Sequence, residues 1–160
     1  MRGMVRFYLL SAATVLGLGY LVFSLVYFSG FPLWRSLDFL ILPGQIERAL
    51  AAYSESDVAA HLHAVLVWDR VFPAYYGVVI SLLVLRYWQG RVRHWYLALL
   101  WLAVAADYVE NYYTVQLLTG KGGVWPHVIA TWVKFWAVSL PMNLGLVRLW
   151  REWRSQALSA

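Results

Sequence analysis

The stretch V-A-A-D-Y-V-E-N-Y-Y-T-V-Q, residues 104–116, decides how the rest of the chain is interpreted. It places Asp107, Glu110 and Asn111 inside a segment that is otherwise apolar enough for a membrane helix. These residues are spaced i, i+3 and i+4, so in a helix they share one face. A charged side chain at the centre of a bilayer costs roughly 2.5–3.5 kcal/mol. We therefore expect this face to point into a bundle of helices.

The composition of the 160-residue chain favours a membrane protein. Hydrophobic residues make up 62% and charged residues 13%, against about 25% charged in ordinary soluble domains. Ten Trp and eleven Tyr suit aromatic belts at two membrane interfaces. The absence of Cys excludes disulfides, thiolate metal sites and cysteine nucleophiles. The net charge of +5 comes from basic residues at the ends of apolar runs, which favours a role in topology over a nucleic-acid partner.

Four apolar runs are long enough to cross a membrane as helices, which takes about 20 residues. They cover approximately residues 5–29, 64–86, 95–118 and 125–149. The first run follows Arg2 and Arg6, and it exceeds the apolar length of about 7–15 residues found in signal peptides, so we expect an uncleaved helix. The sequence thus predicts an all-α fold: a polytopic membrane four-helix bundle forming a single transmembrane domain over residues 1–160.

Arginine positions predict the orientation of the bundle. Arginines lie at the N-terminus, between the second and third runs, and in the C-terminal tail, which places both termini in the cytoplasm of a multi-pass bacterial inner-membrane protein. The 30–63 connection then lies outside. There, the helical spacing of apolar residues from Gln45 to Tyr53 predicts a short amphipathic helix. Ser54 followed by Asp57 resembles a capping box, from which we expect a helix to run without a break into the second span. Within that span we expect Pro73 to kink the helix.

Three predicted spans carry ionisable residues in the outer half of the membrane. Asp69, Glu110 and Lys134 lie about 8, 12 and 15 Å below the outer ends of their helices at 1.5 Å per residue. This agreement predicts one polar cluster. The proposed ligand-binding residues are Asp69, Tyr76, Asp107, Glu110, Asn111 and Lys134. The candidate catalytic residues are Glu110, Asp107 and Asp69, and the sequence leaves open which carboxyl holds a proton.

The favoured function is binding of a small amphiphilic or lipid-like ligand among membrane lipids. Acid–base, isomerase-like chemistry with Glu110 or Asp107 as the proton donor or acceptor is left open. One alternative is a non-catalytic accessory or assembly subunit, as a homo-oligomer or in a complex, whose charges hold the helices in register. A second alternative is proton or ion transport, which would need a polar path through the cytoplasmic half as well.

Three histidines, His61, His63 and His127, fall near the predicted outer surface. Their spacing fits no standard zinc pattern, so we expect solvated histidines and no metal, and the sequence leaves open a metal site at these three positions. We expect no cofactor either, because no histidine pair lies across facing helices at membrane depth to hold haem.

Three motifs resemble those of a group of small bacterial four-helix membrane proteins without a known activity. They are D-R-V-F-P-A-Y-Y-G (69–77), D-Y-V-E-N (107–111) and W-V-K-F-W (132–136). The resemblance covers the chain from about Leu37 to Val147. It implies that the shared positions are Asp69, Phe72, Pro73, Tyr76, Asp107, Glu110, Asn111 and Lys134. The architecture alone is also similar to the EXPERA group of sterol isomerases and sigma-2-type receptors, which implies a lipid-like ligand.

Overall fold

A computed structural model describes residues 36–140, and this part of the chain is all-helical, as predicted. Its elements are η2 (Leu37–Phe39), α2 (Pro43–Ala52), α3 (Glu55–His63), η3 (Ala64–Trp68), α4 (Phe72–Tyr87), α5 (Gly90–Leu118) and a last helix over residues 124–140. The predicted span 5–29 and residues 141–149 of the predicted fourth span lie outside the described residues.

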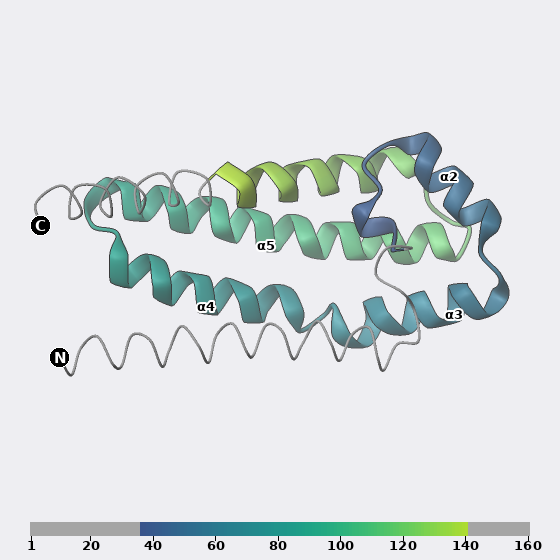
Figure 1. Cartoon of the computed structure of the whole chain (residues 1–160), viewed down its shortest axis with the longest axis horizontal. Helices are drawn as coiled ribbons and strands as arrows, with labels where there is room; N and C mark the ends of the chain where they lie inside the picture. The colour runs from purple at the N-terminus through teal and green to yellow at the C-terminus, as the bar shows by residue number, and fades with distance from the viewer. Residues whose placement is uncertain (1–35, 141–160) are drawn as a thin grey trace, which may run out of the picture.

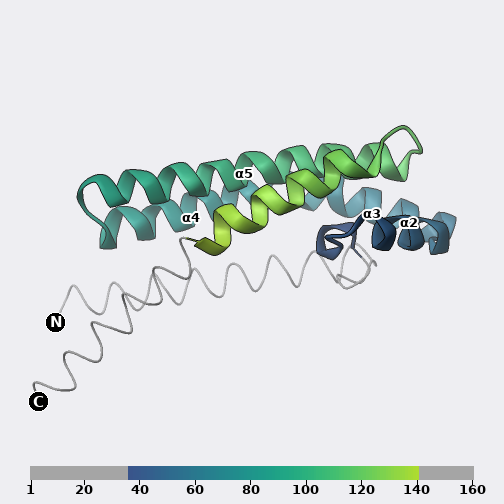
Figure 2. The same ribbon diagram turned by 90° about the horizontal axis from the view of Figure 1, so that it is seen from above.

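The other elements pack around α5, which is 29 residues long. Figure 1 shows α3 and α4 following one another along one side of α5, and Figure 2 shows the 124–140 helix crossing α5 at an angle. η2 and α2 lie at the end of the bundle where α5 ends. The predicted outer connection therefore covers one end of the helices.

Local hydrogen bonds set the ends of several helices. The predicted capping box is confirmed: the Ser54 hydroxyl accepts from the Asp57 amide, and the Asp57 carboxylate accepts from the Ser54 amide. The predicted amphipathic helix is α2, which begins at Pro43, a residue suited to the first turn because it lacks an N–H. α5 ends before Gly120, whose φ of 70° is readily adopted by glycine.

The predicted helix from Ser54 does run without a break into the second span, because α3 continues directly into η3, a turn of π-helix that ends at Trp68. The second span itself is not one helix: residues 69–71 form a turn, and α4 begins at Phe72, so the kink expected at Pro73 is present as a full break. The axis bends by 42° at this break. The physical reason is Pro73, which fits the first turn of a helix but removes a hydrogen bond and clashes with the preceding turn inside one.

Two apolar clusters hold the bundle together at different levels of α5. One is built on Leu37, Ile46, Leu117, Leu118 and Val128, where η2, α2 and the 124–140 helix meet the C-terminal end of α5. The other is built on Tyr76, Leu100 and Val104, where α4 packs on α5. Between these clusters the buried face of α5 is polar.

No described helix is, alone, both long and apolar enough to cross a membrane. The bent pair Glu55–Trp68 and Phe72–Leu82 meets that requirement jointly, by length and composition.

Candidate functional site: a buried polar cluster

The polar face of α5 points into the bundle, as its spacing predicted. Asp107 is 5% exposed, Glu110 and Thr114 are fully buried, and Asn111 is 7% exposed. Buried Leu100 and Val104 precede these residues on the same helix, and Leu117 and Leu118 follow them. The acidic side chains are thus enclosed by apolar layers on both sides.

Lys134 joins the two acidic residues of this face from the 124–140 helix. Its Nζ donates to Asp107 Oδ1 at 3.1 Å and forms an ion pair with Glu110 Oε2. From α4, the Tyr76 hydroxyl donates to Asp107 Oδ2 at 2.9 Å. The Thr131 hydroxyl lies 2.6 Å from Glu110 Oε1 and donates to it. We call these five residues the polar cluster; it connects three helices that are separate in sequence.

Asp69 and Asn111 lie beside the polar cluster, at the break between η3 and α4. The Asn111 amide donates to the backbone carbonyl of Asp69 at 3.1 Å. The half-buried Asp69 carboxyl lies within electrostatic range of Asp107 and Glu110. Arg70 is exposed, so Lys134 supplies the positive charge of the polar cluster among the described residues.

Sequence reasoning missed how the outer connection contributes. Solvated His61 and His127 were expected, and this is wrong: His61 is 1% exposed and His127 is fully buried, whereas His63 is exposed as predicted. The reason is that η2 folds back over the end of the bundle. Its Ser36 hydroxyl lies 3.3 Å from His61 Nε2 and donates to the Asp38 carboxylate at 2.9 Å.

Asp38 was not singled out by the sequence because it lies in a connection rather than in a predicted span. A local signal was present: Ser36 two residues before an acidic residue is typical of a capped helical turn, and the Ser36 side chain does cap η2. Burial lowers the pKa of His61, and the nearby Asp38 carboxylate opposes this effect. His61, which precedes the predicted span 64–86, is therefore a neutral imidazole at pH 7.

An apolar groove of about 450 Å³ lies between α5 and the 124–140 helix. Its walls are Leu102, Ala105, Ala106, Val109, Tyr113, Pro126, Ile129, Ala130 and Val133. None of the polar-cluster residues lines it, although Ala106 and Val133 immediately precede Asp107 and Lys134 in sequence. The groove and the polar cluster therefore occupy neighbouring faces of the same two helices.

Comparison with protein-family models, curated proteins and solved structures found no match to this chain. The resemblance stated from the motifs, and the binding roles of the six residues assigned to the predicted polar cluster, stay predictions.

Proposed function

We propose that this chain is an integral membrane protein that binds a small amphiphilic or lipid-like molecule between α5 and the 124–140 helix. The observation that carries this proposal is the buried polar cluster beside an apolar groove on the same pair of helices. A pocket that combines a largely apolar wall with a few convergent polar groups is the usual form of a small-molecule site.

Membrane integration is supported by the apolar side chains on the outside of the described helices. Trp136 is 60% exposed, Ile129 59%, Leu82 54% and Trp101 47%. Soluble monomers rarely expose apolar patches larger than a few hundred Å², whereas lipid tails are suitable neighbours for such side chains. We propose the four spans and the cytoplasmic termini that the sequence predicts.

The amphiphile would meet both parts of this site. The Lys134 side chain is 22% exposed, so it forms the accessible edge of the otherwise buried polar cluster. There a ligand's polar group can contact the ammonium and exchange hydrogen bonds with Asp107 or Glu110. The groove volume of about 450 Å³ falls within the range of about 300–1,000 Å³ for ligand pockets, which leaves room for an apolar chain.

Native mass spectrometry of protein purified in a mild detergent tests this proposal. The variants Glu110→Gln and Lys134→Met are compared with wild type. Glu47→Gln and Lys121→Met are matched controls, because they make the same chemical changes at exposed positions. We expect a small molecule or lipid that co-purifies with wild type and both controls and is lost from both cluster variants.

Bare protein in all five samples would refute ligand binding. If the cluster variants were then merely less stable, with an unchanged oligomer mass, the charges would serve to hold the helices in register. That result would favour the accessory-subunit alternative.

A further inference from the structure

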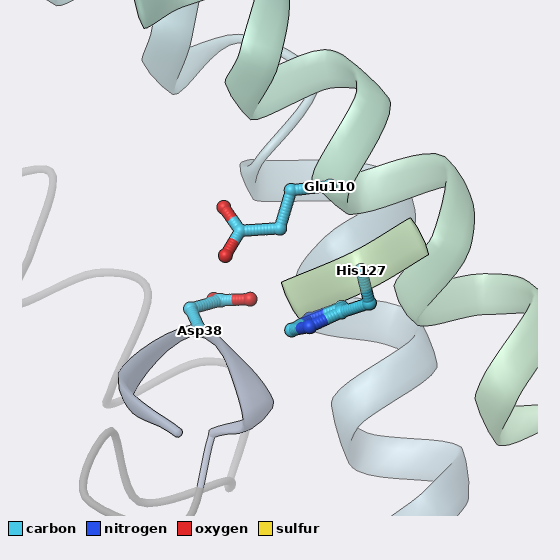
Figure 3. Close-up of side chains that lie close together, drawn as sticks. All are labelled: Asp38, Glu110 and His127. Carbon is cyan, nitrogen blue, oxygen red and sulfur yellow. The ribbon is translucent and has the colours of Figure 1, made fainter. Parts of the chain in front are cut away.

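We infer that Asp38, Glu110 and His127 form a binding site for a divalent transition-metal ion. One potential ligand atom from each residue lies within 4.8 Å of the other two. Figure 3 shows the three side chains pointing toward one another from η2, α5 and the 124–140 helix. The inference goes beyond the proposed function and does not depend on the amphiphile.

Two of the three side chains carry a potential ligand atom that has no partner in the part of the chain that the structure describes. Nε2 of the fully buried His127 and Oδ1 of Asp38 are buried and have no hydrogen-bond partner among the described residues. Buried polar atoms are nearly always satisfied, because leaving them unpaired is costly. Two such atoms on side chains that lie this close together are explained if an ion binds between them. An imidazole nitrogen and carboxylate oxygens are ordinary metal ligands.

The hydroxyl groups of Ser36 and Thr131 orient the carboxylates of Asp38 and Glu110 for metal binding. Ser36 donates to Asp38 Oδ2 at 2.9 Å, which leaves Oδ1 free. Thr131 donates to Glu110 Oε1 at 2.6 Å. Hydrogen bonds to ligating carboxylates are the usual support of metal sites and tune their affinity. The side chains are thus held in position before an ion arrives.

The charge balance also favours a cation. The carboxylates of Asp38, Asp107 and Glu110 all act on the ammonium of Lys134. When the three are ionised, two negative charges remain uncompensated, and one divalent ion balances them. Lys134 also contacts Asp107, so it keeps a partner when Glu110 turns to the metal.

The donor set identifies the class of ion. Two carboxylates and one imidazole suit Zn²⁺, Mn²⁺ or Fe²⁺, whereas Ca²⁺ and Mg²⁺ prefer oxygen ligands alone. Tetrahedral zinc with bonds of about 2.1 Å holds its ligand atoms about 3.4 Å apart. Small side-chain rotations close the present spacing of up to 4.8 Å. With three protein ligands, one coordination position stays open for water or a further ligand.

Metal titration of the full chain in detergent tests this inference. Chelator-treated protein is titrated with Zn²⁺ and Mn²⁺ by calorimetry, and bound metal is counted by elemental analysis. We expect one ion per wild-type chain. Asp38→Asn and His127→Asn should lose it, and His63→Asn, the same change at an exposed position, should keep it. Ser36→Ala, which retains all three ligands, should bind about 10- to 100-fold more weakly.

Three outcomes would overturn the inference: no binding to wild type, wild-type affinity in His127→Asn, or equal loss in His63→Asn. Circular dichroism and elution volume check that each variant is folded. If Asp38→Asn and His127→Asn fail to fold, the Co²⁺ absorption bands of wild type and Ser36→Ala test the inference instead. Bands of a low-coordinate cobalt site with weaker binding in Ser36→Ala support the site, and their absence refutes it.

Discussion

Replacing Asn111 by Leu should destabilise the bundle, and it should do so chiefly because residue 73 is a proline. In a regular α-helix the N–H of residue 73 would donate to the carbonyl of Asp69, four residues earlier. Pro73 has no N–H, and the Asn111 amide donates to that carbonyl instead, at 3.1 Å. The Asn111 side chain of α5 thus replaces a backbone hydrogen bond that Pro73 of α4 cannot make.

The size of this effect follows from burial at the break. Asn111 is 7% exposed, and leaving a buried acceptor unpaired costs about 1–3 kcal/mol. The Asn111 Oδ1 atom is itself buried without a hydrogen-bond partner among the described residues, so Leu also removes one unpaired acceptor. We therefore expect Asn111→Leu to lower the free energy of unfolding by about 1–2 kcal/mol, in the lower part of that range.

A double-mutant cycle with Pro73→Ala isolates the interaction. An alanine at this position restores an N–H that can donate to the Asp69 carbonyl, so Asn111→Leu should then cost less, with a coupling energy of about 1 kcal/mol. Unfolding is followed by circular dichroism during titration with a denaturing detergent. The cavity left by Pro73→Ala lowers stability in both arms and cancels in the cycle. Equal costs of Asn111→Leu in the two backgrounds would refute the compensation.

Three further perturbations test the site and its frame. Lys134→Met removes one partner of a buried ion-pair network and leaves carboxylates uncompensated, so we expect a loss of about 3–5 kcal/mol by the same unfolding assay. Gly77→Ala places a Cβ 2.8 Å from Val104 Cγ2, where α4 packs on α5, and should cost about 1–3 kcal/mol through overpacking. His61 should make stability depend on pH. Because burial lowers the pKa of folded His61 below the ordinary histidine value of 6.5, the unfolded chain binds more protons, and stability should fall as pH drops below about 6.5. His61→Gln should flatten this part of the pH profile, measured with a chelator present.

Matched controls accompany these variants. Lys121→Met removes an exposed ammonium, Gly44→Ala adds a Cβ where nothing lies within 4 Å, and His63→Gln changes an exposed imidazole. The two exposed-residue controls should leave the measured quantity nearly unchanged, and Gly44→Ala, which lies in α2, should raise stability by up to about 1 kcal/mol through helix propensity. If a control changed the measured quantity as much as its partner variant does, the assay would report general damage to the protein. If the pH profile of His61→Gln equalled that of wild type, His61 would not be the cause of the pH dependence.

Features that depend on local chemistry were predictable from the sequence. The i, i+3, i+4 spacing of Asp107, Glu110 and Asn111 determined which face of α5 is buried, because helical geometry alone relates those positions. The Ser54–Asp57 capping box is equally local. The kink at Pro73 was predicted from the proline alone, whereas the full break at residues 69–71 was not. Its exact form depends on η3 and on Asn111, a side chain 38 positions away.

The burial of His61 and His127 and the partial burial of Asp38 could not be predicted, because they depend on where the outer connection folds. That path is set by contacts between distant residues. Leu37 and Ile46 pack against the C-terminal end of α5, and the Trp132 indole donates to the Ile41 carbonyl at 3.3 Å. The predicted spans contained no information about this covering segment, so histidines near a helix end were assigned to solvent.

The pattern of satisfied and unsatisfied atoms distinguishes a purely structural polar cluster from one that binds something. Charges that serve only to fix helix register gain most when every buried donor and acceptor is paired, because a partly satisfied network is costly in a low dielectric. Asp107 meets this condition, because both of its oxygens accept hydrogen bonds. Asp38 Oδ1 and His127 Nε2 do not meet it. Their side chains lie together where η2, α5 and the 124–140 helix converge (Figure 3), so a role in fixing helix register leaves these two atoms unexplained, whereas a bound ion would pair them.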